Sequence, residues 1–284
     1  MPEQTVRSHP SPRALLDKYG LRAKKSWGQN FLGDEQILDG IARLAVESPG
    51  ERVVELGAGL GHLTARLAAH GGVVVAVERD RDMARVLRGE LGERVTLLEA
   101  DAARLDYGAL AAGGRIAVVG NLPYHLTSPI LFSLLDQADH VSRAVFLVQA
   151  EVAERLAASP GTKDWGLLSV LLQQRATVSL ERRVPRGAFL PPPRVESAVV
   201  RVGFGEALVP VDDPAWFRRV VKAGFAQRRK VLSNALAGAG LGAPEVILGA
   251  LAEAGVEPRR RGETLSVEEW ARLARALPKI AAER

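Results

Sequence analysis

Apolar residues follow two different spacings along this chain. After residue 50, short runs that are apolar at nearly every position alternate with stretches in which apolar residues recur every three or four positions. The runs predict strands at 53–56, 73–77, 95–98, 116–119 and 144–148. The intervening stretches predict helices at 62–69, 80–91 and 128–135, and residues 34–45 form another helical pattern with Asp34 placed to cap it. Such alternation indicates a doubly wound α/β domain whose parallel sheet is covered on both faces.

The pattern changes beyond residue 204. Two further strands are expected at 175–182 and 197–202, on either side of a proline-rich turn at 190–193. After them only helical patterns remain, at 214–226, 229–237, 244–254 and 267–276. We therefore expect an α/β domain over residues 24–205 and an all-helical domain over 206–284.

The first residues of the chain are polar and basic. Residues 1–25 carry six basic and two acidic side chains, three prolines, and no helical apolar stripe before Leu15. We expect residues 1–23 to form a flexible basic arm.

Composition narrows the chemistry available. The net charge is +5, the isoelectric point is about 9.8, and 31 of the 38 basic residues are arginine. Arginine suits phosphate recognition, but a genome rich in G and C would produce the same excess. With no cysteine, disulfides, zinc ribbons, iron–sulfur sites and thiol nucleophiles are excluded, and the five histidines show no metal-ligand spacing.

Without a signal sequence or an apolar run of about 18 residues, we expect a cytoplasmic protein with no membrane association.

A glycine loop follows the first predicted strand of the sheet. Gly57 and Gly59 lie in the sequence VVELGAGLG, which passes from the strand into a helix, and Glu78 ends the next strand. Glycines let the backbone turn sharply and approach a ligand closely, and an acid at the position of Glu78 can accept hydrogen bonds from ribose hydroxyls.

Two nucleotide ligands fit this loop. The motif of a dinucleotide-binding site has a further glycine three residues after the position of Gly59, where this chain has His62. S-adenosylmethionine carries no phosphate and does not need that glycine. Asp101 could accept a hydrogen bond from its adenine amino group. The loop by itself favours S-adenosylmethionine over NAD only modestly.

The four residues Asn121, Leu122, Pro123 and Tyr124 follow the fourth predicted strand, at the sheet edge where ligands bind. They suit methylation of an exocyclic amine, whose lone pair is delocalised into the base. The Asn121 side-chain oxygen and the Leu122 carbonyl can draw that amine toward tetrahedral geometry, and Tyr124 can stack on a base flipped out of its helix. Catalysis is then mostly positioning of the amine in line with the methyl donor.

With these motifs in place, the chain resembles the KsgA-type small-subunit ribosomal RNA adenine dimethyltransferases over about 24–273. The shared segments are KKSWGQNFL (24–32), VVELGAGLGHLT (53–64), NLPYHLTSPI (121–130), FLPPPRVESAVVR (189–201), FAQRRKVLSNAL (225–236) and RGETLSVEEW (261–270). The last two resemble KsgA-type members specifically, whereas the others are shared with macrolide-resistance ribosomal RNA methyltransferases. Ala58, Trp27 and His125 depart from residues common in the family.

The resemblance implies a Rossmann-like methyltransferase domain with a C-terminal helical domain. It implies transfer of methyl groups from S-adenosylmethionine to N6 of two adjacent adenines in the 3′-terminal hairpin loop of small-subunit rRNA, without a metal and as a monomer. The implied cofactor residues are Asn30, Leu32, Gly57, Gly59, Glu78, Asp101 and Asn121. The implied catalytic residues are Asn121, Leu122, Pro123, Tyr124 and Phe189, where Phe189 either forms a base sandwich with Tyr124 or anchors its own loop.

Basic side chains without compensating acids predict the RNA-facing surface. The stretch 218–230 contains six basic residues and no acid, and 259–261 adds three arginines. The expected RNA-binding residues are Lys24, Lys25, Arg218, Arg219, Lys222, Arg228, Arg229 and Lys230. Three other functions compete with this interpretation: methylation of large-subunit rRNA, a nucleic-acid-binding factor without catalysis, and a dinucleotide oxidoreductase.

Overall fold

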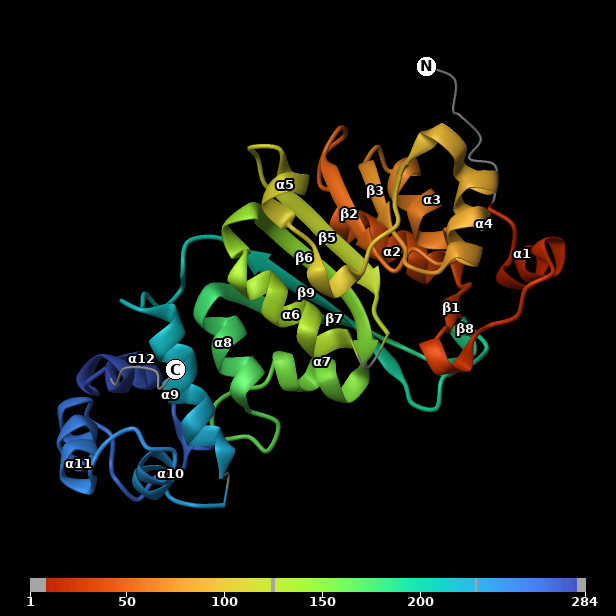
Figure 1. Cartoon of the computed structure of the whole chain (residues 1–284). Helices are drawn as coiled ribbons and strands as arrows, with labels where there is room; N and C mark the ends of the chain where they lie inside the picture. Colours follow the sequence, from red (N-terminus) through yellow and green to blue (C-terminus); the bar gives the residue numbers. More distant parts are fainter. Residues whose placement is uncertain (1–8, 124–125, 228, 280–284) are drawn as a thin grey trace. The chain divides into compact units, whose positions relative to one another are not determined.

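The computed structural model describes residues 9–123, 126–227 and 229–279. The chain divides into two compact units (Figure 1). The first consists of the residues up to 153 together with 179–204, and the second of 154–178 together with the residues from 205 onward. Within the described ranges, no helix combines the length and apolar character that crossing a membrane requires.

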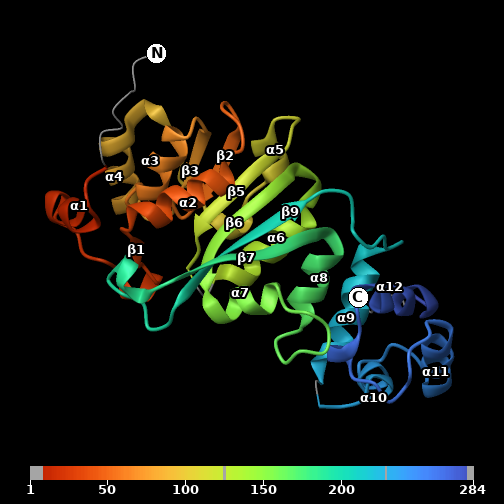
Figure 2. The same cartoon turned by 180° about the vertical axis from the view of Figure 1, so that it is seen from behind.

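A seven-stranded sheet forms the framework of the first unit, in the order β4-β3-β2-β5-β6-β9-β7. The strands are β2 (Arg52–Leu56), β3 (Val73–Val77), β4 (Thr96–Leu98), β5 (Ile116–Asn121), β6 (Val141–Gln149), β7 (Ala176–Val184) and β9 (Ser197–Phe204). Figure 2 shows β7 and β9 side by side at one end of this sheet.

The parallel sheet predicted from the sequence is present in β4, β3, β2, β5 and β6. Strand β9 departs from it, because it pairs antiparallel to β6 with Val199 opposite Leu147. An antiparallel neighbour needs no helical crossover, and a strand buried on both faces has the same apolar pattern in either direction. Sequence periodicity therefore could not distinguish the two orientations.

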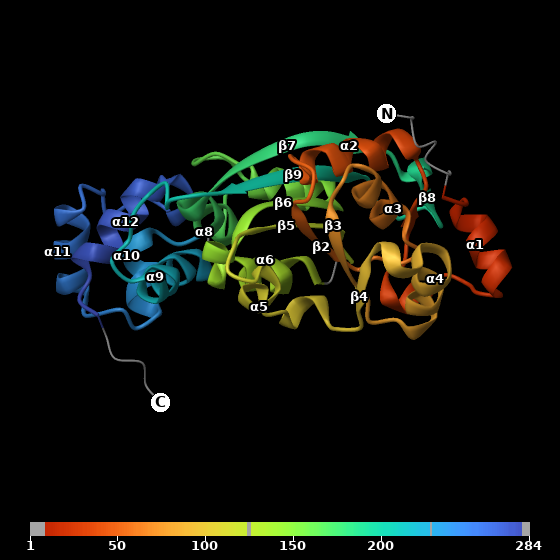
Figure 3. The same ribbon diagram turned by 90° about the horizontal axis from the view of Figure 1, so that it is seen from above.

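Helices cover both faces of the sheet, as predicted. Helices α2 (Glu35–Ala45) and α3 (His62–Ala69) lie on one face, and α5 (Tyr107–Ala111) and α6 (Thr127–Asp136) on the other (Figure 3). The apolar stripe of α2 is buried against Val53 and Val145 in one core cluster, and Asp34 caps this helix by accepting the Ile37 N–H. These helices hold the strand ends, and therefore the loops that follow them, in fixed positions.

The flexible arm predicted for residues 1–23 is wrong for residues 9–23, and residues 1–8 lie outside the described ranges. Helix α1 (Pro12–Tyr19) is capped by Ser11 and packs on α4 (Arg81–Leu91). Leu15 and Leu16 are buried beside Met83 and Val86. Two leucines are too few to form a visible period, so only the presence of α4 shows that this helix is buried.

The domain boundary also differs from the prediction. Residues 154–178, expected in the α/β domain, belong to the second unit. There the Trp165 indole N–H donates to the Leu265 carbonyl (3.0 Å) and the Gln174 amide to the Val209 carbonyl (2.7 Å). Helix α8 (Leu167–Arg175) is buried through most of its length, so it has no polar face by which the sequence could reveal a helix.

The second unit otherwise matches the predicted helices closely. It contains α9 (Pro214–Ala226), α10 (Leu232–Gly238), α11 (Pro244–Glu253) and α12 (Val267–Ala276). Helix α7 (Ala150–Leu156), which follows β6, was not predicted.

Candidate active site

A cavity of about 220 Å³ lies at the carboxyl ends of β2, β3 and β5 in the first unit. The carboxyl edge of a parallel sheet is the usual position of a ligand site in such folds. The cavity brings together ten of the residues predicted from the sequence, which are Asn30, Leu32, Gly57, Gly59, Glu78, Asp101, Asn121, Leu122, Pro123 and Phe189. Tyr124 and His125 lie outside the described residues.

The glycine loop forms one wall of the cavity. Gly57, Gly59 and Gly61 all have positive φ, at 71°, 56° and 85°, which residues with a side chain adopt only with strain. The Gly59 N–H donates to Glu78 Oε2 (2.8 Å), and the Gly57 N–H donates to the Val77 carbonyl (2.9 Å). The loop between β2 and α3 is therefore tied to the end of β3.

Glu78 supports this wall and also lines the cavity. Its other carboxylate oxygen accepts the Asp80 N–H (2.8 Å). Burial raises the pKa of Glu78. The hydrogen bonds that its carboxylate accepts from backbone N–H groups lower the pKa and partly offset that effect. A carboxylate oxygen can accept two hydrogen bonds, so Glu78 retains the capacity to accept hydroxyl groups of a ligand.

Glu55 is a candidate site residue that sequence reasoning missed. It lies on β2, lines the cavity and is 2% exposed, and its Oε2 has no hydrogen-bond partner among the described residues. Burial is the main cause that raises the pKa of Glu55 to about 8. An acid inside an otherwise apolar strand was the sequence signal that could have found it, because such a residue is rarely buried without a function.

Asn121 ends β5 at the floor of the cavity. Its side-chain N–H donates to the Asn30 carbonyl (2.9 Å), which places the amide nitrogen on that side and leaves Oδ1 as a separate acceptor. The Leu122 N–H donates to the Leu147 carbonyl of β6 (3.0 Å). Both residues are therefore held by neighbouring backbone, which is the rigidity that precise positioning of a substrate requires.

A network of charges holds residues 24–30 against the start of α4. The Lys24 ammonium contacts Asp80 Oδ1 and Asp82 Oδ2, each at 2.7 Å, and the Gln29 amide donates to Asp80 Oδ2 (2.8 Å). Lys24 was expected to contact RNA, but its charge is already paired with two carboxylates. Lys24 thereby fixes the segment that leads to Asn30, and its contact with RNA stays a prediction. The side chain of Lys25 lies outside the description.

Two short strands close the cavity on another side. Strands β1 (Phe31–Leu32) and β8 (Phe189–Leu190) pair antiparallel, with Leu32 opposite Phe189. Phe189 is 5% exposed and belongs to the core cluster that includes Leu38 and Val184. It also lines the cavity. Its packing fits the predicted role of loop anchor, and a sandwich with Tyr124 stays a prediction.

Trp27 and Arg79 lie at the mouth of the cavity. The Arg79 guanidinium contacts Asp101 Oδ2 (3.3 Å) and lies 4.8 Å from the centre of the Trp27 ring, with the Lys24 ammonium 5.4 Å from the same centre. Trp27 is 38% exposed, an unusual position for so large an aromatic ring. This arrangement places a flat, exposed indole beside the predicted adenine-recognising acid.

The charges in the cavity allow the two nucleotide ligands to be tested for fit. Three acids line it, Glu55, Glu78 and Asp101, and Arg79 is paired with the last of them. Buried carboxylates would repel a pyrophosphate but would favour a cationic ligand rich in hydroxyl groups. Glu55 Oε2 is buried without a hydrogen-bond partner among the described residues, and because the pKa of this acid is raised to about 8, Glu55 offers a ligand a hydrogen-bonding group rather than a full charge at neutral pH. The residues present therefore fit S-adenosylmethionine and disfavour NAD. Among the described residues, no cluster of three or more potential metal ligands occurs.

The predicted RNA-binding residues of the helical unit differ in their surroundings. Lys222, Arg229 and Lys230 are exposed at the end of α9 and in the turn after it, whereas Arg218 and Arg219 are partly buried. The Arg219 guanidinium lies 5.6 Å from the Trp216 ring centre. Arg228 is outside the described residues.

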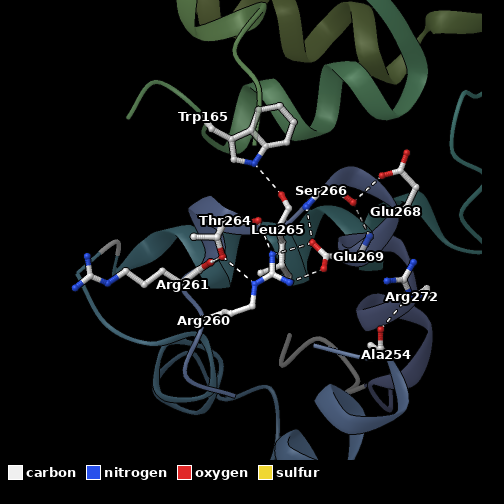
Figure 4. Close-up of polar contacts among 10 residues, drawn as sticks. All are labelled: Trp165, Ala254, Arg260, Arg261, Thr264, Leu265, Ser266, Glu268, Glu269 and Arg272. Atoms are coloured by element: carbon white, nitrogen blue, oxygen red, sulfur yellow. Dashed lines mark hydrogen bonds and ion pairs between the residues drawn. The ribbon is translucent and has the colours of Figure 1, made fainter. Parts of the chain in front are cut away.

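The arginine cluster 259–261 is not a single surface. Arg260 donates to Glu269 through two nitrogens (2.5 and 3.0 Å) and to the Thr264 carbonyl (2.5 Å), so its charge serves the packing of the unit. Figure 4 shows Arg260 pointing into this network, which includes the Ser266–Glu269 capping box of α12, while Arg261 points away from it. Arg259 and Arg261 are exposed.

The fold and the cavity are those of a methyltransferase that acts on exocyclic amines. The sheet is Rossmann-like, its glycine loop is tied to an acid, and an Asn-Leu-Pro segment lies at the same cavity. The family model described as ribosomal RNA adenine dimethylase matches residues 20–279, and the chain belongs to this family. The resemblance seen in the sequence is thereby confirmed.

Named relatives agree with this assignment. The chain is 69% identical over 279 residues to "Ribosomal RNA small subunit methyltransferase A" of Anaeromyxobacter dehalogenans (strain 2CP-C), covering 95% of this chain and 98% of that protein. It is 52% identical to the protein of the same name from Myxococcus xanthus (strain DK1622), covering 94% and 95%.

Solved structures share the fold. The 23S rRNA methyltransferase ErmE superposes with a TM-score of 0.67 at 27% identity, covering 87% of this chain and 99% of that one. A dimethyladenosine transferase from Plasmodium falciparum superposes with a TM-score of 0.69 at 21% identity, covering 86% and 95%, which supports the fold alone.

Proposed function

We propose that this protein transfers methyl groups from S-adenosylmethionine to N6 of two adjacent adenines in the 3′-terminal hairpin loop of small-subunit rRNA, giving N6,N6-dimethyladenines during subunit biogenesis. The observation that carries the proposal is Asn121, whose amide nitrogen is bound to Asn30 so that its oxygen remains an acceptor at the cavity. Membership of the rRNA adenine dimethylase family supports the same substrate class.

We assign the catalytic roles to the residues around Asn121. Its Oδ1 and the Leu122 carbonyl accept the two N–H groups of the target amine and draw the nitrogen toward tetrahedral geometry. Pro123 restricts the backbone that orients this carbonyl. Tyr124 stacks on the flipped adenine, and Phe189 either forms the opposite face or anchors its loop. The amine loses its proton readily once it carries the new methyl group, so the chain needs no strong base.

S-adenosylmethionine, when bound, supplies the electrophilic methyl group of a sulfonium. The cofactor residues are those assembled at the cavity. Gly57 and Gly59 would allow the loop backbone to approach the cofactor closely. Glu78 would accept hydrogen bonds from the ribose hydroxyls, and Asp101 would accept one from the adenine amino group. Asn30 and Leu32 complete the wall of the cavity. Glu55 joins this set as a buried acid of the cavity lining, whose Oε2 has no hydrogen-bond partner among the described residues and would be available to the cofactor.

RNA contact is assigned to the exposed cations of the helical unit, chiefly Lys222, Arg229 and Lys230. Arg218, Arg219 and Arg228 extend the same basic stretch of the sequence, and Lys25 stays a predicted RNA contact. Lys24 holds residues 24–30 in place through Asp80 and Asp82, and its predicted contact with RNA remains part of the proposal. A ribosomal substrate places the protein in the cytoplasm, and we propose that it acts as a monomer.

A methylation assay with three proteins tests the proposal. The wild type, Asn121→Ala and the matched control Asn234→Ala, an exposed asparagine of α10, are incubated with labelled S-adenosylmethionine and unmethylated small subunits. We expect Asn121→Ala to lower incorporation by about a hundredfold or more, because an acceptor that orients the reacting group is lost, and Asn234→Ala to match wild type.

The modified nucleotides then identify the substrate. Mapping at nucleotide resolution is expected to show two adjacent dimethyladenines in small-subunit rRNA. Modification of large-subunit rRNA instead would contradict the proposed target, and equal incorporation by Asn121→Ala would contradict the proposed mechanism.

A further inference from the structure

Two histidines link the N-terminal segment to the glycine loop by reciprocal hydrogen bonds. His9 Nε2 lies 2.9 Å from the Leu60 carbonyl oxygen, and His62 Nε2 lies 2.9 Å from the Pro10 carbonyl oxygen. A carbonyl oxygen can only accept, so each Nε2 carries the donated proton. The two rings meet edge to face, with centroids 4.8 Å apart.

His62 forms part of the cavity wall, whereas His9 does not line the cavity. Gly57 to Leu60 and His62 line the cavity, whereas none of the described residues of 9–23 does so. Leu60 is also buried in the same apolar cluster as Leu15 and Leu16 of α1. The loop is therefore held from its far side by the segment that precedes and includes α1, while its near side faces the cavity.

The surroundings keep both imidazoles neutral. His62 is 9% exposed, and burial lowers its pKa to about 4, while burial also lowers the pKa of His9. Two neutral rings can lie edge to face without repulsion.

We propose that His9 and His62 form a latch through which residues 9–10 hold the glycine loop in the conformation that binds the cofactor. His9 is thus a positioning residue that acts through Leu60 without touching the cavity. The inference rests on the proposed use of this cavity for S-adenosylmethionine. It assigns a function in cofactor binding to a segment that the sequence predicted to be a flexible arm.

His9→Ala is the decisive variant, because His9 does not line the cavity. We expect it to raise the KM for S-adenosylmethionine about five- to tenfold, the equivalent of one hydrogen bond, while kcat changes less than about twofold. His62→Ala should show the same split between KM and kcat. His9→Gln and His62→Gln keep an N–H donor and should lie closer to wild type. His140→Ala, at an exposed histidine away from the loop, is the matched control.

The double variant His9→Ala/His62→Ala tests whether the two bonds act as one device. We expect its KM to rise less than the product of the two single effects, because either substitution already releases the loop. Full multiplication of the single effects, or an unchanged KM in His9→Ala, would overturn the latch.

Two controls separate this inference from other failures. Thermal unfolding of every variant shows whether the protein is folded, and His9→Phe or His62→Phe, which keep a ring but have no N–H donor, replace any Ala variant that is not. Calorimetric titration of wild type with S-adenosylmethionine tests the proposed function by itself. If wild type binds and His9→Ala binds equally well, only the latch fails; if wild type does not bind, the proposed function fails.

Discussion

Glu55 shows how a single residue couples the site to stability. In the unfolded chain its carboxyl has a pKa near 4.5, and burial in the folded protein raises the pKa to about 8. Between these values the folded protein binds the proton that the unfolded chain releases. The stability associated with Glu55 is therefore fully present below pH 4.5 and is lost as pH rises through about 8.

Replacing Glu55 with glutamine is expected to remove this dependence. Between about pH 5 and pH 8 the free energy of unfolding of wild type should fall relative to that of Glu55→Gln, with a slope of up to ~1.4 kcal/mol per pH unit. Urea denaturation at several pH values measures both proteins. Parallel curves would show that Glu55 does not titrate in this range.

Trp27 offers a direct report on the cofactor cavity. The other three tryptophans, Trp165, Trp216 and Trp270, are buried in the helical unit, whereas Trp27 is exposed at the cavity mouth. Binding of S-adenosylmethionine next to Arg79 and Asp101 should cover this indole and change its emission intensity or maximum. We expect a saturable change on titration that Trp27→Phe abolishes. The same change in Trp27→Phe would mean that the ligand does not reach this end of the cavity.

At the scale of elements, the docking of α1 on α4 is the feature with the largest consequence. Leu15 is fully buried in this contact, and the Tyr19 hydroxyl and Lys18 ammonium bind Glu90 of α4 at 2.8 and 2.6 Å. We expect Leu15→Ala to lower the free energy of unfolding by about 2–4 kcal/mol through reduced burial and a residual cavity. Leu208→Ala, where the leucine is 55% exposed, should change it by less than about 0.5 kcal/mol. Equal small effects of both substitutions in a denaturant titration would mean that α1 is not docked in solution.

At the scale of the whole molecule, the distribution of basic residues predicts electrostatic binding of RNA. Affinity for small-subunit rRNA should fall steeply as the salt concentration rises. Replacing Lys222, Arg229 and Lys230 with alanine should make the plot of log K against log salt concentration less steep. The slope should decrease by roughly 0.7–0.9 for each phosphate that is no longer neutralised. Replacement of Arg43, Arg52 and Arg88, which are exposed on the first unit, removes the same charge and serves as control. Filter binding at several salt concentrations measures the slopes. Equal slopes for the two triple variants would place the RNA interface elsewhere.

Local patterns were sufficient for most of the framework. The bounds of α3, β3, α9 and α12 were predicted to the residue, because each has either an uninterrupted apolar run or a one-sided stripe with clear ends. The site residues at strand ends were also predictable, since parallel strands bring their carboxyl ends to one edge. Helix α8 and strand orientation at β9 were not predictable, because uniform burial removes the contrast between faces.

The sequence by itself determined the family, the α/β and helical units, and the residues that meet at the cavity, because these depend on local spacing and on short motifs. Only the tertiary structure decided that residues 9–23 support the glycine loop and that Lys24 and Arg260 are held in ion pairs. It also decided that Glu55 is buried with one oxygen, Oε2, lacking a hydrogen-bond partner among the residues that the structure describes. The reason is physical: the role of a charge or a short apolar stretch depends on what packs against it, and many of those partners lie far away in the chain.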